Sequence, residues 1–230
     1  MPLMSATTES PSLPLRYVTP SGWAAQVLSR PLALLNDHAH LEKKAAANAL
    51  ELLNRWPGRE DAGPDEKDLA TQWAGTMTAV ARDEADHLGI VLRLLIRRGG
   101  KFTKSHRNPY AAALRRLVRI GRGPQELLDR LLISALIEAR SCERFELLAE
   151  ESDDRELKRL YRGLAGSERG HYLVFVDLAR RLPAIKGAKE ADARWDAMLD
   201  AEAKIIAEQP MYAGMHSGVE TERRRDEETK

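Results

Sequence analysis

Apolar residues recur at three- and four-residue spacing over four long segments of the chain, which is the period of an amphipathic helix. Pro31 stands where a first helical turn favours proline, and Gly99-Gly100 follows the second segment as a helix stop. The pattern therefore predicts long helices over about 31–56, 65–98, 125–151 and 154–182.

Shorter segments flank these four helices. A short helix is expected after Ser21, a second within PYAAALRRLVRI, and an amphipathic helix over 189–208. Residues 1–20 are rich in Ser, Thr and Pro and are expected to be loosely ordered, and residues 209–230 are expected to form a tail that ends in the charged run ERRRDEETK. We expect one helical domain over 21–208.

The lengths of the connections indicate how the helices are arranged. The second pair is joined by the tight, polar Ser152-Asp153-Asp154, whereas residues 99–123 form a long crossover between the pairs. Two helical hairpins joined by one long connection are typical of one variant of the four-helix bundle. The predicted fold is all-α: a ferritin-like four-helix bundle with one long crossover and extra terminal helices.

Composition narrows the cellular setting. Ala, Leu, Glu and Arg dominate the 230 residues, which favours helix. The single cysteine, Cys142, excludes an internal disulfide and suits a reducing compartment. The N-terminus lacks the apolar core of a secretory signal, and no apolar run approaches the ~20 residues that cross a bilayer. We expect a cytoplasmic protein without a membrane partner.

Six ionisable residues interrupt the apolar stripes of the four long helices. The segments ARDEADH and GSERGH each contain Glu-x-x-His, and each is preceded by a lone glutamate on the helix before it. Residues three apart lie on one helical face, so each pair can reach a common centre. The candidate metal ligands are Glu42, Glu84, His87, Glu138, Glu168 and His171.

Glu-x-x-His alone is weak evidence, because 21 Glu and six His in 230 residues supply about half of one such pair by chance. Two pairs occur, and all six residues stand where an ionised side chain is costly unless it is paired or metal-bound. The alternative is that the glutamates pair with nearby arginines and the histidines are ordinary core residues; those arginines are Arg82, Arg162 and Arg169.

Oxygen-rich ligation with two imidazoles favours iron or manganese over zinc. In the expected arrangement Glu84 and Glu168 bridge two metals, and each metal is completed by one further glutamate and one histidine. Such a pair can bind and reduce molecular oxygen. His38 is either a supporting contact or a core residue, Cys142 is expected to be structural, and a carboxylate that orients a ligand histidine is sought among Asp37, Asp86 and Asp177.

The crossover region is strongly basic. No Asp or Glu occurs between Leu88 and Gln125, whereas ten Arg or Lys do, which indicates a phosphate-rich partner; the alternative is a solvated loop that aids solubility. The candidate RNA contacts are Arg97, Arg98, Lys101, Lys104, Arg107, Arg115, Arg116, Arg119 and Arg122.

Several segments together resemble a known family. LLNDHAHLEKKAA, ARDEADHLGIVLRLLIRRGG, NPYAAALRRLVR, LLISALIEARSCERFELLA and GSERGHYLVFVDLA are similar to the tRNA isopentenyladenosine hydroxylase (MiaE) family, and IEARSCERF is the most specific of these strings. The resemblance covers about 31–182. The family's six ligands fall on the six candidates above, and Gly170 departs from the larger helix former expected before His171.

The resemblance implies an oxygen-dependent, non-haem di-iron monooxygenase. It implies two iron ions as cofactor, molecular oxygen as co-substrate, an electron donor, and as substrate a tRNA with 2-methylthio-isopentenyladenosine next to the anticodon. The residues alone leave two other functions open: a ferritin-like oxidase or peroxidase with a non-nucleic-acid substrate, and an iron-storage protein. They also leave open whether the chain is a monomer or a small oligomer.

Overall fold

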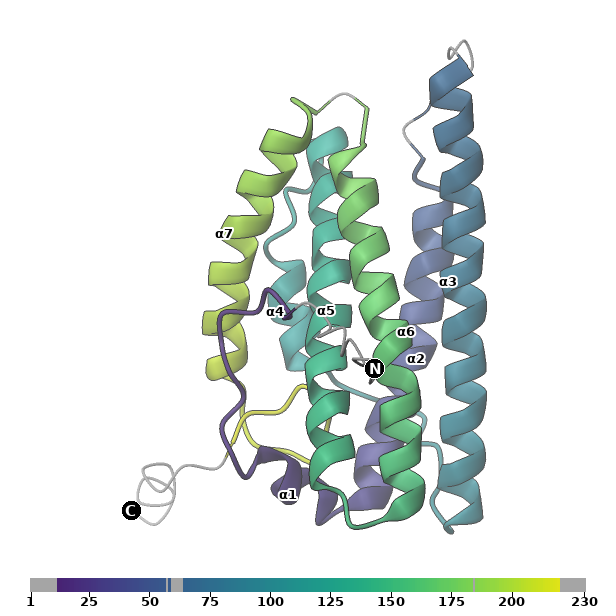
Figure 1. Cartoon of the computed structure of the whole chain (residues 1–230), viewed down its shortest axis with the longest axis vertical. Coiled ribbons are helices and arrows are strands. Elements are labelled where there is room, and N and C mark those ends of the chain that lie inside the picture. The colour runs from purple at the N-terminus through teal and green to yellow at the C-terminus, as the bar shows by residue number, and fades with distance from the viewer. Residues whose placement is uncertain (1–11, 57, 59–63, 184, 220–230) are drawn as a thin grey trace, which may run out of the picture.

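Seven α-helices make up the regular structure in the computed structural model, which describes residues 12–56, 58, 64–183 and 185–219 (Figure 1). No β-strand occurs among these residues. The helices are α1 (Trp23–Leu28), α2 (Pro31–Leu53), α3 (Pro64–Arg97), α4 (Pro109–Arg115), α5 (Pro124–Glu151), α6 (Arg155–Arg180) and α7 (Ala188–Ala207). None of these helices is long and apolar enough to cross a bilayer.

The four long helices form two antiparallel hairpins. α2 packs along α3, and α5 packs along α6, while α3 and α6 bring the two hairpins together. The crossover between the hairpins contains α4, which with α7 covers α5; in Figure 1 α4 lies behind α5 and α7 runs along the left side. The all-α, ferritin-like prediction is confirmed, and so are the positions of all seven expected helices.

Local sequence explains where the helices begin and end. The Asn108 side chain accepts a hydrogen bond from the amide of Ala111 at 3.0 Å and caps α4, and Asp154 accepts from the amides of Glu156 and Leu157 and caps α6. Such caps contribute ~1 kcal/mol each. Gly99 has φ 82°, a left-handed conformation that glycine adopts at little cost, and it follows the last turn of α3.

Two hydrophobic clusters fill the bundle, one on each side of a polar layer. The first cluster contains Leu52, Met77, Leu131 and Phe175, and the second contains Leu35, Val91, Phe145, Tyr161 and Leu164; the first also receives the inner face of α7. On every long helix the candidate ligands fall between the residues of the two clusters. The bundle therefore holds the polar layer at its middle, between two packed ends.

The segment after α7 folds back onto the bundle. Met215, His216 and Ser217 are fully buried; the Met215 amide donates to Asp37 at 2.7 Å, and the Trp23 indole donates to Ser217 Oγ at 3.0 Å. Residues 209–219 thus belong to the folded domain, although the sequence predicted a tail from 209. The run ERRRDEETK lies outside the described residues, as do 1–11 of the N-terminal segment, whose remaining part contacts the core through Leu15 and Tyr17.

A buried ion pair ties the outer helices to the bundle. Arg140 on α5 donates to both carboxylate oxygens of Glu202 on α7, at 2.9 and 3.0 Å, and both side chains are fully buried. The Tyr110 hydroxyl on α4 donates to the same carboxylate at 2.9 Å. Burial lowers the pKa of Arg140, but the contact with Glu202 raises it above its ordinary value overall.

We expect Glu202→Ala to reduce the free energy of unfolding by about 3 kcal/mol, because it removes the buried, two-oxygen partner of the Arg140 guanidinium and leaves only the partly exposed Glu143 as counter-charge. Urea denaturation followed by circular dichroism measures the change. Asp196→Ala is the matched control on α7, since Asp196 pairs with Arg16 at the surface, and it should change stability little. An equal loss in both variants would refute the structural role given to the buried pair.

Candidate metal centre

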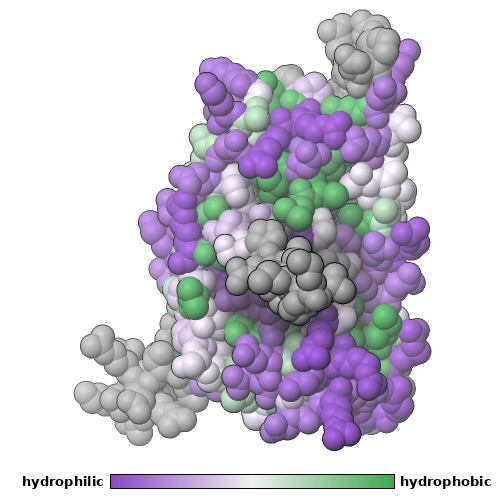
Figure 2. Space-filling model, in the orientation of Figure 1, coloured by the Kyte–Doolittle hydropathy of each residue, from purple (hydrophilic) through white to green (hydrophobic). Residues whose placement is uncertain are grey.

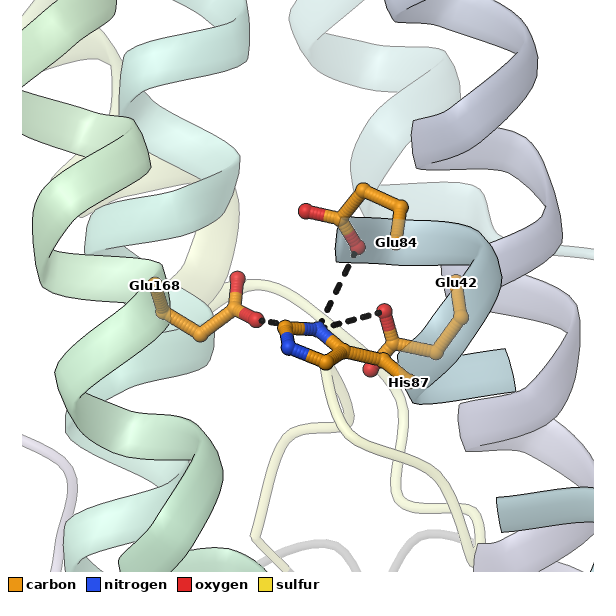
Figure 3. Close-up of side chains that lie close together, drawn as sticks. All are labelled: Glu42, Glu84, His87 and Glu168. Atoms are coloured by element: carbon orange, nitrogen blue, oxygen red, sulfur yellow. Dashed lines mark ion pairs between the residues drawn. The ribbon is translucent and has the colours of Figure 1, made fainter. Parts of the chain in front are cut away.

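Six side chains from four helices meet in the polar layer between the two hydrophobic clusters. α2 supplies Glu42, α3 supplies Glu84 and His87, α5 supplies Glu138, and α6 supplies Glu168 and His171. All six are buried, with exposed fractions between 0 and 7%. Figure 3 shows four of them, pointing from three helices into the same space. The structure thus brings together every candidate ligand named from the sequence.

The ligand atoms form two overlapping groups. Glu42, Glu84, His87 and Glu168 offer one set of atoms within 4.8 Å of one another, and Glu84 and Glu168 also belong to a second such set, completed by Glu138 and His171. Two carboxylates are therefore common to both groups. Each group has three carboxylates and one imidazole, so the layer has the pseudo-symmetric donor set of a two-metal site.

The distances within the cluster are short. His87 Nδ1 lies 3.5 Å from Glu168 Oε1 (Figure 3). The same nitrogen lies 3.8 Å from Glu42 Oε2 and 3.8 Å from Glu84 Oε2. On the other side, His171 Nδ1 lies 2.7 Å from Glu84 Oε1. The two imidazole rings are 6.1 Å apart. Both histidines thus direct Nδ1 toward the carboxylates.

Several polar atoms of the cluster are buried and make no hydrogen bond of regular geometry, although His171 Nδ1 and Glu84 Oε1 are only 2.7 Å apart. These atoms are both carboxylate oxygens of Glu84, Glu168 Oε1, and Nδ1 of His87 and His171. Burying such atoms without a partner is costly, and here they face one another. The pairing with arginine considered as an alternative is not found among the described residues, because Arg82 contacts Asp83 and Arg169 contacts Glu146. The donor set fits cations bound between these side chains.

The electrostatics of the cluster agree with this fit. Burial, together with the nearby Glu138, raises the pKa of Glu84 to about 8, and burial and Glu84 raise the pKa of Glu168 to about 7. Burial lowers the pKa of His87, but its contacts with Glu168, Glu42 and Glu84 outweigh this and raise it to about 12. Buried carboxylates repel one another unless protons or cations lie between them, and divalent cations provide that charge directly.

His38 contacts one of the candidate ligands, Glu42. His38 Nε2 lies 2.5 Å from Glu42 Oε1, and the His38 ring packs against Phe145 and Tyr161. Burial raises the pKa of Glu42, but the contact with His38 lowers it to well below its ordinary value. His38 is thus a supporting contact, one of the two roles that the sequence left open.

The carboxylate beside a ligand histidine was not anticipated. Asp83 Oδ2 lies 3.6 Å from His171 Nε2, the nitrogen on the far side of the ring from the cluster. The expected candidates lie elsewhere: Asp37 contacts His106 and the Met215 amide, Asp86 is exposed, and Asp177 pairs with Arg181. Asp83 precedes Glu84 in the sequence, but it faces a different helix, α6, which no local pattern indicates.

Cys142 has the structural role that was expected of it. The side chain is fully buried, and its Sγ donates to the carbonyl of Ala165 at 3.2 Å. Burial raises the pKa of the thiol to about 12, so the group stays protonated and inert at neutral pH.

The basic residues of the crossover divide into two groups. Arg97 pairs with Glu156, Arg98 with Asp154 and Glu156, and Arg119 with the buried Asp129, so carboxylates on α5 and at the start of α6 neutralise these three. The other six candidates are exposed and have no carboxylate within ion-pair distance among the described residues; they are Lys101, Lys104, Arg107, Arg115, Arg116 and Arg122.

A passage leads from the surface to the cluster between α2, α4 and α5. It encloses about 670 Å³ including its open mouth, and Glu138 forms part of its lining. Its apolar walls are Leu41, Ala45, Ala111, Val118, Ile133 and Ile137. Its polar lining includes Lys44, Arg115 and Arg130, together with Asn48, whose amide donates to Ser134 Oγ at 2.9 Å.

Comparison with known proteins identifies the same type of molecule. Residues 8–217 match the family described as tRNA-(MS[2]IO[6]A)-hydroxylase (MiaE). The chain is 37% identical over 203 residues to the tRNA 2-(methylsulfanyl)-N(6)-isopentenyladenosine(37) hydroxylase of Pseudomonas putida, covering 87% of this chain and 90% of that protein. It is 29% identical over 244 residues to the enzyme of the same name from Salmonella typhimurium, covering 89% and 88%.

A solved structure shares the fold. It is a protein from Synechococcus with aldehyde deformylating oxygenase activity, 32% identical, with a TM-score of 0.76 over 90% of this chain and 98% of that one. The family match spans all four ligand-bearing helices and confirms the resemblance noted from the sequence. The chain therefore belongs to the tRNA-(MS[2]IO[6]A)-hydroxylase (MiaE) family.

Proposed function

We propose that this protein is an oxygen-dependent di-iron monooxygenase that hydroxylates the isopentenyl group of 2-methylthio-isopentenyladenosine next to the anticodon in tRNA. The observation that carries the proposal is the buried set of four carboxylates and two imidazoles at the end of an apolar passage. Family membership supports the choice of substrate over an unrelated small molecule or stored iron.

The two ligand groups suggest how a pair of irons would be held. Glu84 and Glu168 belong to both groups, so each of them would serve as a ligand to both irons. Glu42 and His87 would complete one metal, and Glu138 and His171 the other. Asp83 would orient His171 through its outer nitrogen, and His38 would hold Glu42, as carboxylate and histidine partners commonly do around metal ligands.

When bound, the iron pair supplies the oxidising power, drawn from molecular oxygen and two electrons, that an unactivated methyl C–H bond requires. The net reaction places one oxygen atom of O₂ in that C–H bond and releases the other as water, consuming two electrons and two protons. The chain contributes rigid ligands and a buried layer in which the hydrophobic clusters on both sides exclude water.

The passage between α2, α4 and α5 suits the prenyl group. An isopentenyl chain is apolar and branched, and six apolar side chains line the passage together with Glu138. Burial of each methylene contributes ~0.8 kcal/mol, which favours entry of the chain over its exposure. The modified adenosine lies in a single-stranded loop, so its base can leave the stack without opening a duplex.

Cationic side chains around the passage would receive the phosphates on either side of that adenosine. Arg115 is exposed and has no carboxylate partner among the described residues, whereas Arg130 pairs with Glu126. Burial, and then the nearby Arg115, lower the pKa of Lys44, so added negative charge is favourable here. The exposed crossover cations continue this surface beyond the passage. A tRNA substrate places the reaction in the cytoplasm.

The metal assignment predicts about two irons per chain in protein expressed with sufficient iron. Glu84→Ala should lose most of this iron, because it removes a ligand common to both metals. Glu146→Ala, which removes a carboxylate on α5 that contacts Arg169 instead, is the matched control and should keep it. Iron is measured by atomic emission on folded, monodisperse protein. Full iron content in Glu84→Ala, or full activity with zinc alone, contradicts the assignment.

The substrate assignment predicts that Ala45→Phe blocks the passage and lowers hydroxylation at least about tenfold without loss of iron. Ala47→Phe places the same ring on the exposed face of α2 and should leave hydroxylation unchanged. Each variant is expressed in cells that lack the enzyme, and digested tRNA is analysed by mass spectrometry for both prenyl nucleosides. Normal hydroxylation by Ala45→Phe would place the substrate elsewhere. Absence of the hydroxylated nucleoside with the wild-type enzyme would refute the proposed reaction.

A further inference from the structure

A second hollow opens on the face formed by α3 and α6. It encloses about 1010 Å³ including its open mouth, and its floor is formed by Leu94, Leu160 and Leu164. His87 lines the same hollow. The hollow therefore reaches a candidate metal ligand directly from solvent, without passing through the α2–α4–α5 passage.

The rim of this hollow is strongly basic. Arg93 on α3 and Arg159 on α6 line the hollow. Three more cations near the start of α6 lie on the adjoining surface; they are Arg155, Lys158 and Arg162. None of the five has a carboxylate within ion-pair distance among the described residues, whereas the nearby Glu156 is already paired with Arg97 and Arg98. We define the α3–α6 basic face as Arg93, Arg155, Lys158, Arg159 and Arg162.

This face and the substrate passage lie on opposite sides of the bundle. The passage opens between α2, α4 and α5 and reaches Glu138, whereas the hollow opens between α3 and α6 and reaches His87. In Figure 1 α6 lies in front, while α4 and α2 lie behind. Figure 2 shows strongly hydrophilic side chains gathered over the lower end of α6, where the basic face begins. A tRNA loop inserted in the passage would leave this face free.

Resting on the proposed function, we propose that the α3–α6 basic face docks an acidic one-electron carrier protein, which delivers the electrons of the hydroxylation through the His87 side of the centre. Each reduced carrier gives up one electron and leaves oxidised. Two successive visits would supply the electron pair that the net reaction consumes.

Charge and geometry favour this partner. Electron-transfer partners form small, weak complexes, and complementary charge raises their rate of encounter. Two of the five cations, Arg93 and Arg159, line the hollow that reaches the candidate ligand His87, and the other three lie on the adjoining surface. Together they provide the attraction, and the hollow provides a short route. Surfaces that bind single-stranded RNA commonly use aromatic side chains to stack bases. No Phe, Tyr or Trp occurs among the residues that line this hollow, and its one imidazole is the buried His87.

The test uses the iron-loaded protein and reduced plant-type [2Fe–2S] ferredoxin, an acidic carrier of low potential. Stopped-flow absorbance without oxygen gives the second-order rate constant of reduction at several ionic strengths. For Arg93→Glu/Arg159→Glu/Arg162→Glu we expect a fall of at least about tenfold at low ionic strength, and convergence with wild type as salt screens the charges. Reduction by dithionite, which needs no protein docking, should stay unchanged.

Arg115→Glu/Arg116→Glu, at the C-terminal end of α4, is the matched charge-reversal control. It should weaken tRNA binding while leaving reduction by ferredoxin unchanged, and the α3–α6 variant should do the opposite. If ferredoxin reduces the triple variant of the α3–α6 basic face at the wild-type rate, the proposal is wrong. If that variant also loses tRNA binding, the face is an RNA-binding surface.

Failure of the proposed function would be recognised separately. If the wild-type protein held no reducible iron, dithionite would produce no absorbance change. Calorimetry of ferredoxin binding to the metal-free protein would then still test the docking site. Binding that is present in wild type and lost in the α3–α6 variant supports the face as a docking site. Equal binding, or none, overturns it.

Discussion

The repulsion among four buried carboxylates is the constraint on which the rest of this structure depends. Glu84 and Glu168 stand in the centre of the layer, and burial and mutual charge raise the pKa of each. Such a layer is costly unless cations neutralise it, and packing alone does not remove the cost. The two hydrophobic clusters on either side of the layer stabilise the helices that hold the carboxylates in place. Packing at the two ends of the bundle therefore offsets the unfavourable free energy of burying the carboxylates in its middle.

Access to this layer follows from the way the hairpins are joined. Because the long crossover carries α4 across α5, one face of the bundle has an apolar passage with cations among its lining residues. Between α3 and α6 a hollow reaches His87. In the proposed reaction the tRNA loop would enter the α2–α4–α5 passage, and the electron carrier would dock on the α3–α6 basic face on the opposite side of the bundle.

Much of the fold and the ligand set could be predicted because both depend on local periodicity. The candidate ligands were identifiable because each interrupts an apolar stripe on its own helix, as Glu138 does between Ser134 and Cys142. What the sequence did not indicate depends on contacts between distant segments. Asp83 supports a histidine on another helix, and carboxylates at 154 and 156 neutralise Arg98 across more than fifty residues. The buried segment around His216 has no helical period, and only the completed bundle provides the surface that covers it.

The central claim, that the polar layer holds two metals which share Glu84 and Glu168, is tested most directly by anomalous diffraction at the iron edge from crystals of the iron-loaded protein. Two separate iron peaks are predicted between the carboxylates, one beside His87 and one beside His171, at the ~3.5–4 Å separation typical of two-metal sites. A single peak, or peaks outside the layer formed by the six ligands, would contradict the account.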